Sequence, residues 1–109
     1  MRFWHIAHPS WTPGEPLRCR NDLEADGVDL PWLWDEADEG TDCDRVCLFP
    51  DTERGRREAE WLLDDRPGYS VVRVDLPDNV EVTRAEWEPY PAVLGEIPAV
   101  FLTRAEAIG

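Results

Sequence analysis

The chain has 109 residues, of which 24 are Asp or Glu and 11 are Arg, with no Lys, so that its formal net charge is −13. This length has room for one domain, which we expect to span residues 1–109, and an apolar content of 42% excludes a disordered chain. No apolar run reaches the ~18–20 residues of a membrane span and the N-terminus lacks a signal-peptide pattern, so we expect a cytoplasmic protein without membrane association.

The negative charge disfavours direct binding to nucleic acid, because phosphate repels an acidic surface. Three interpretations of the charge remain open. It serves solubility or adaptation to salt, it forms a face for a basic protein partner, or it mimics phosphate in an inhibitor. The sequence does not specify an oligomeric state.

The first half of the chain predicts short elements. An apolar and aromatic run over residues 3–7 predicts a strand that carries His5, with Trp4 on the opposite face because side chains alternate along a strand. A second strand follows the turn at Thr12-Pro13-Gly14. Residues 21–27 predict one or two helical turns. A strongly acidic loop covers residues 35–44.

The second half predicts one main helix among strands. A buried strand over residues 45–49 ends at Pro50, and a helix from about Thr52 to Leu63 follows, with its apolar stripe at positions 59, 62 and 63. Residues 69–76 alternate clearly as a strand, and shorter elements are expected at 80–87, 92–94 and 97–102. One helix beside many strands predicts a small α+β domain with a mostly antiparallel or split sheet.

Cysteine usage indicates neither disulfides nor a metal site. The three cysteines, Cys19, Cys43 and Cys47, are an odd number, so we expect them to be reduced. Together with a histidine they supply four zinc ligands in number, but structural zinc sites use tighter, paired cysteine spacings. We therefore predict no metal site.

Three segments carry a resemblance to a known family. The opening F-W-H-I-A-H-P-S-W-T-P-G-E-P-L resembles the first motif of the ADP-ribosyltransferase superfamily. Small rifamycin-modifying members of that superfamily begin with an aromatic-aromatic-His strand and have Gly-Asp-Leu at this distance. The strand–helix–strand segment over residues 46–76 is similar in order and spacing. The tail G-E-I-P resembles the Ile-Pro that follows the last catalytic strand in many members.

The resemblance implies an ADP-ribosyltransferase-like fold that binds NAD and transfers ADP-ribose to an acceptor the sequence does not identify. His5 matches the residue that contacts the ribose. Trp4, Phe49 and Tyr69 supply aromatic surface for the cofactor. The family's Gly-Thr after the histidine is Ile6-Ala7 here, which removes a glycine from the cofactor contacts.

The catalytic carboxylate is not fixed by the resemblance. Three candidates, Glu86, Glu88 and Glu96, lie near the last predicted strands. Glu88 is favoured, because it precedes Pro89 at an expected strand end. The alternative function belongs to another class: an acidic interaction protein, such as an inhibitor, an antitoxin or a nucleic-acid mimic, that binds a basic partner.

Overall fold

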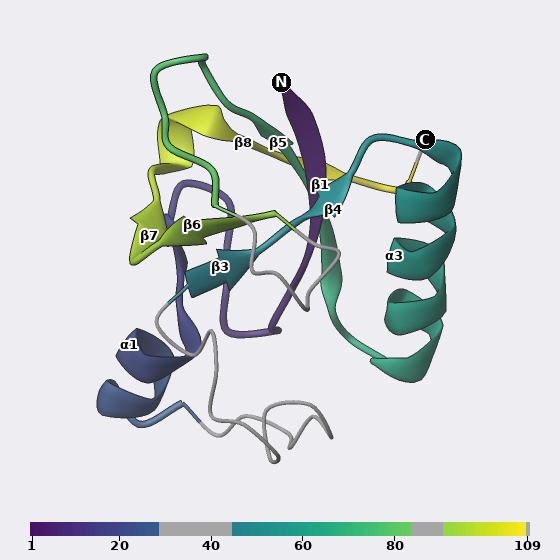
Figure 1. The fold of residues 1–109 in the computed structure, drawn as a ribbon. Coiled ribbons are helices and arrows are strands. Elements are labelled where there is room, and N and C mark those ends of the chain that lie inside the picture. The colour runs from purple at the N-terminus through teal and green to yellow at the C-terminus, as the bar shows by residue number, and fades with distance from the viewer. Residues whose placement is uncertain (29–44, 84–90, 109) are drawn as a thin grey trace.

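A computed structural model describes residues 1–28, 45–83 and 91–108, which form short strands with one long helix at their side (Figure 1). The elements in chain order are β1 (Arg2–Ala7), β2 (Leu17–Arg18), α1 (Arg20–Ala25), β3 (Arg45–Cys47), β4 (Phe49–Pro50), α3 (Glu53–Asp65), β5 (Ser70–Asp75), β6 (Ala92–Leu94), β7 (Glu96–Ile97), a 3₁₀ helix (Ala99–Phe101) and β8 (Leu102–Ala105). None of the helices in these ranges is long and apolar enough to cross a bilayer.

The main sheet has four strands in the order β4-β1-β5-β8, and every pairing in it is antiparallel. The β1 strand lies inside this sheet and pairs along its whole length with β5, with His5 opposite Val72. Two further antiparallel pairs, β2-β7 and β3-β6, form separate two-stranded sheets. An α+β domain with split antiparallel sheets and one main helix is therefore confirmed.

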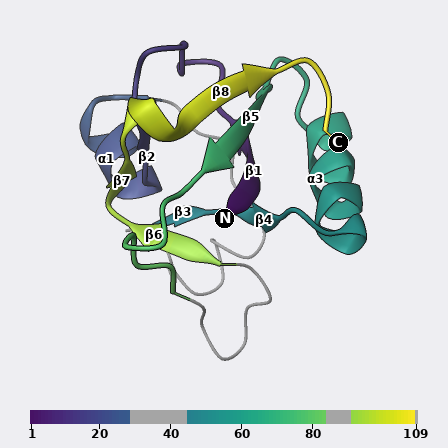
Figure 2. The ribbon, with the colours of Figure 1, turned by 90° about the horizontal axis from the view of Figure 1, so that it is seen from above.

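The α3 helix covers one face of the main sheet (Figure 2). It begins after Thr52, whose side-chain oxygen accepts a hydrogen bond from the Gly55 amide at 3.0 Å and so satisfies one of the free amides of the first turn. Ala59 is fully buried in a cluster with Trp4, Ile6 and Val71, and Leu62 and Leu63 are half-buried against it. The predicted apolar stripe of the helix is confirmed.

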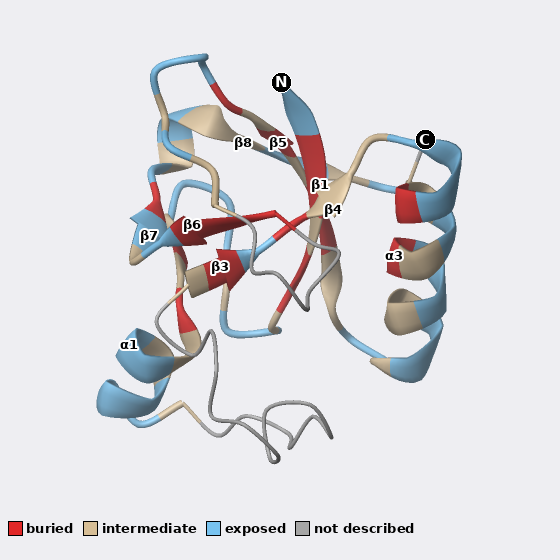
Figure 3. Cartoon of the chain, viewed as in Figure 1, coloured by how far each residue is buried: buried red, intermediate tan, exposed pale blue. Residues whose placement is uncertain are grey.

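The opposite face of the main sheet packs against the two small sheets. Alternation along β1 and β5 places Phe3, Ala7, Val72 and Val74 on this side. The small sheets contribute the buried residues Leu17, Val46, Val93 and Ile97 to the same core, and Leu48, between β3 and β4, joins them. The two central strands of the main sheet, β1 and β5, are therefore largely buried, between α3 and the small sheets, whereas the edge strands β4 and β8 are more exposed (Figure 3).

Two predicted elements are divided in the structure. Residues 45–49 form β3 and β4 in different sheets, because the chain crosses from one sheet to the other at Leu48, whose amide donates to the Pro91 carbonyl at 2.9 Å. Residues 97–102 contain the end of β7, a 3₁₀ turn that starts after Pro98, and the start of β8. Proline has no amide to continue a ladder, which explains the break there.

The strand expected over residues 80–87 is not formed in its described part. Residues 80–83 hold one isolated bridge, in which the backbones of Thr83 and Ala92 exchange two hydrogen bonds of 2.8 Å. The remainder of that prediction, like the predicted acidic loop, lies outside the described residues.

Candidate functional site

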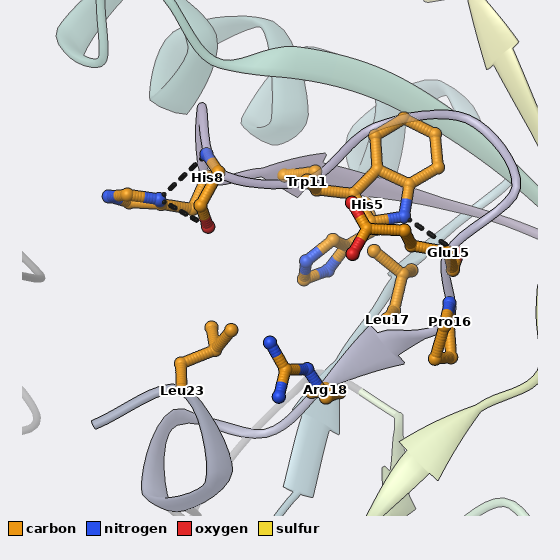
Figure 4. A pocket seen from close by; sticks show the side chains of 10 residues that line it. His5, His8, Trp11, Glu15, Pro16, Leu17, Arg18 and Leu23 are labelled. Atoms are coloured by element: carbon orange, nitrogen blue, oxygen red, sulfur yellow. Dashed lines mark hydrogen bonds between the residues drawn. The ribbon is translucent and has the colours of Figure 1, made fainter. Parts of the chain in front are cut away.

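A shallow hollow lies beside β1 on the side of the small sheets (Figure 4). Its wall comes from β1, the loop over residues 8–16, β2 and α1, and includes His5, His8, Trp11, Glu15, Arg18 and Leu23. The hollow encloses about 30 Å³, which is room for about two ordered water molecules. A larger ligand bound here would extend over its rim.

The His5 imidazole is held in one orientation at this hollow. Its Nδ1 lies 2.8 Å from the Cys47 carbonyl oxygen. A carbonyl only accepts hydrogen bonds, so Nδ1 donates, and in the neutral ring Nε2 carries the lone pair. The expected place of His5 on a strand, with Trp4 on the opposite face, is confirmed, and the structure adds that this strand is central in its sheet and that His5 lines the hollow.

Burial decides the protonation state of His5. Desolvation lowers the pKa of the imidazole, and the hydrogen bond to the Cys47 carbonyl, which favours the charged ring, offsets this only in part. The ring is therefore neutral at pH 7, and Nε2 is available as a hydrogen-bond acceptor.

The loop over residues 8–16 is stabilised by its own hydrogen bonds. The Glu15 carboxylate accepts from the backbone amide and the hydroxyl of Thr12, which lowers the pKa of Glu15. The Trp11 indole Nε1 donates to the Glu15 carbonyl at 2.9 Å. Gly14 has φ 99°, a left-handed conformation that glycine adopts without steric cost. These bonds position Trp11 at the rim of the hollow.

Arg18 is the only arginine among the lining residues and extends into the hollow from β2. Its guanidinium forms an ion pair with Asp26 at the end of α1. In the ladder between β2 and β7, Arg18 is directly opposite Glu96. Directly opposite residues of a ladder project on the same face, so Glu96, which is exposed, projects on the same face of this small sheet as Arg18, although it does not itself line the hollow.

The structure does not bring the other predicted cofactor residues to His5. Trp4, Phe49 and Tyr69 belong to the cluster on the α3 side of the main sheet, where Trp4 Nε1 donates to Asp51 at 2.8 Å. Tyr69 does not line the hollow, but its ring meets the ring of His8, which does, edge-on with 5.5 Å between ring centroids.

The predicted catalytic residues are divided between described and undescribed segments. Glu86 and Glu88 lie outside the described residues, and Glu96 is the candidate that the structure places. Three residues of the hollow, Trp11, Glu15 and Arg18, were not predicted as site residues. The turn at Thr12-Pro13-Gly14 was the available signal for the first two, and no sequence signal indicated Arg18.

Comparisons of the chain with protein-family models, curated proteins and solved structures give no match. The geometry of the hollow and the sequence motif that contains His5 are the features of this chain that bear on its function.

Proposed function

We propose that this domain is an ADP-ribosyltransferase-like cytoplasmic protein that binds NAD at the hollow beside His5 and transfers ADP-ribose to an acceptor. One observation carries the proposal: the neutral imidazole of His5, in the aromatic-aromatic-His motif, turns Nε2 away from its backbone partner Cys47. A ribose hydroxyl donates naturally to such a nitrogen.

The aromatic surface in this proposal is Trp11. Its indole lines the same hollow as His5 and is held by the bond to Glu15. A flat indole face at the rim suits an aromatic ring of the cofactor, since stacked rings gain contact area without directional partners. Trp4, Phe49 and Tyr69 then act indirectly, by packing β1 against α3.

The carboxylate in this proposal is Glu96. In ADP-ribosyl transfer, the bond between the ribose C1′ and the nicotinamide nitrogen breaks, nicotinamide leaves with the bonding electrons, and positive charge develops on the ribose. A carboxylate near that charge stabilises the transition state more than the ground state. An acceptor nucleophile then bonds to C1′ and releases its proton to solvent. The support for Glu96 is its register directly opposite Arg18, on the same face of the β2-β7 pair, from which a carboxylate would act on ligand that extends over the rim of the hollow.

His5→Ala tests NAD binding directly. We expect wild-type protein to bind NAD in calorimetric titrations and the variant to bind at least about tenfold more weakly, because the ribose loses its acceptor. Thr103→Ala, at an exposed position on β8, serves as the control and should bind like wild type. Absence of wild-type binding at millimolar NAD would refute the proposal.

Glu96→Gln tests catalysis separately from binding. We expect unchanged NAD affinity and a loss of nicotinamide release of roughly 100-fold, because Gln keeps the shape and removes the charge. Gln variants of Glu86 and Glu88 test the two other candidates in the same assay. If the Gln variant of Glu86 or of Glu88 abolishes nicotinamide release and Glu96→Gln does not, that other glutamate is the catalytic residue.

The net charge of −13 favours the second candidate, an acidic protein that binds a basic partner. Titration with an arginine-rich peptide distinguishes it from the first. Salt-sensitive peptide binding together with absent NAD binding would support the interaction protein.

A further inference from the structure

The Arg18 guanidinium in the hollow has a weak protein partner. Arg18 is 30% exposed and Asp26, its ion-pair partner, is 55% exposed. The pair uses the Nη1 nitrogen. Among the described residues, Nε and Nη2 of Arg18 have no hydrogen-bond partner.

A phosphate group is a better partner for this guanidinium than Asp26. A phosphate accepts two parallel hydrogen bonds from the guanidinium fork, whereas an exposed single-nitrogen pair with a carboxylate is weakened by water and salt. A phosphate ligand therefore has a physical reason to displace Asp26 from Arg18.

The same hollow also contains a hydrogen-bond acceptor, His5 Nε2, and its volume is small. Nε2 of the neutral His5 can accept a hydrogen bond from a hydroxyl, and the Arg18 guanidinium can donate to an anion. About 30 Å³ is too little for a whole dinucleotide but holds part of a small polar group, with the rest of the ligand over the rim beside Trp11. A ligand that matches both groups carries a hydroxyl and a phosphate on one small framework.

We propose that the hollow is a subsite for a sugar phosphate, in which Arg18 leaves Asp26 to bind the phosphate and His5 Nε2 accepts a hydrogen bond from a sugar hydroxyl. The inference rests on the proposed function and deepens it, because NAD contains such a unit. Asp26 is then a counter-ion that competes with the ligand for Arg18.

The test uses ribose 5-phosphate, which contains no nicotinamide, and follows its binding by NMR titration of the backbone amides. Arg18→Gln should weaken binding at least about tenfold, since the phosphate loses its cation. Asp26→Asn should strengthen binding about threefold or more, because the competing carboxylate is removed. The control is Arg20→Gln, at an arginine that pairs with Glu24 on α1 and does not line the hollow.

Inorganic phosphate is the second probe. It lacks a sugar, so Arg18→Gln should weaken its binding while His5→Ala should leave it unchanged. The inference is overturned if Asp26→Asn binds ribose 5-phosphate no more tightly than wild type. If Arg18→Gln does not fold, Asp26→Asn still tests the inference, because its expected effect is tighter binding of ribose 5-phosphate.

The two proposals fail separately in these experiments. Binding of ribose 5-phosphate that depends on Arg18, without any nicotinamide release from NAD, supports the subsite and refutes ADP-ribosyl transfer. Nicotinamide release that Arg18→Gln leaves unchanged supports transfer and overturns the subsite.

Discussion

The protonation of His5 links its environment to the stability of the protein. Because burial lowers the pKa of His5 in the folded state, the unfolded chain, with a pKa of about 6.5, binds this proton more readily. The free energy of unfolding is therefore highest, as far as His5 is concerned, above pH 6.5. It decreases as the pH falls from there to the folded-state pKa, and below that value His5 has no further effect.

We predict that His5→Asn flattens this part of the pH profile. An Asn side-chain amide can still donate to the Cys47 carbonyl but does not titrate. Urea denaturation between about pH 7.5 and pH 5 gives the profile for both proteins, and His8 is present in both. Coincident slopes for the variant and the wild type would show that His5 titrates normally in the folded state.

At the residue scale, the sequence predicted the orientation of His5 but not its neighbours. Strict alternation along a strand was sufficient to place Trp4 opposite His5. The same alternation excludes Trp4 from the site that contains His5, and in the structure Trp4 lies in the cluster on the α3 side of the sheet. Arg18 was not predictable, because it reaches the hollow through the pairing of β2 with β7, and these strands are far apart in the chain.

At the element scale, the first turn of α3 is built around a close backbone contact. A Cβ atom on Gly55 would lie 2.0 Å from the Pro50 carbonyl oxygen at the end of β4. A real Cβ never approaches an oxygen this closely, so the glycine allows the helix to pack directly against the strand that precedes it. Gly55 is buried, so a side chain at this position would force the first turn of the helix away from β4.

We predict that Gly55→Ala destabilises the fold by roughly 1–3 kcal/mol, the usual range for overpacking. The sign of the change in stability is informative, because Gly→Ala inside an unobstructed helix stabilises the protein by up to about 1 kcal/mol. Arg57→Ala, on the exposed side of α3, is the control and should change stability little. A stabilising effect of Gly55→Ala in urea denaturation would mean that β4 and α3 are farther apart than described.

The sequence predicted best those helices and strands whose apolar residues recur with a clear period. The α3 helix and β5 show their apolar periods over several residues, and both were placed within about two residues of their ends. The division of residues 45–49 between β3 and β4 was not predictable. It depends on a hydrogen bond from Leu48 to Pro91, a contact between distant segments that leaves no local pattern.

At the scale of the whole molecule, charge acts over distances comparable to its size. The fold measures 31 × 28 × 27 Å, and the Debye length is about 30 Å at 0.01 M salt but about 3 Å at 1 M. At low salt, each carboxylate therefore interacts with most of the others across the molecule. At high salt, only charges in contact still interact. The ion pair of Arg57 with Glu53 on α3 is exposed on both sides and therefore weak.

We predict that the melting temperature rises by about 5 °C or more between 0.01 M and 1 M NaCl, because screening relieves the repulsion among 24 carboxylates that only 11 arginines offset. A variant in which the exposed Glu60, Asp78 and Glu81 are replaced by Gln or Asn is the matched control. It should melt at a higher temperature than wild type at low salt, and its melting temperature should rise less when salt is added.

Equal melting temperatures of the wild-type protein from low to molar salt would instead mean that self-repulsion does not limit stability. The surplus carboxylates would then be better explained as a surface for a basic partner, whose binding added salt should weaken while the free domain stays unchanged.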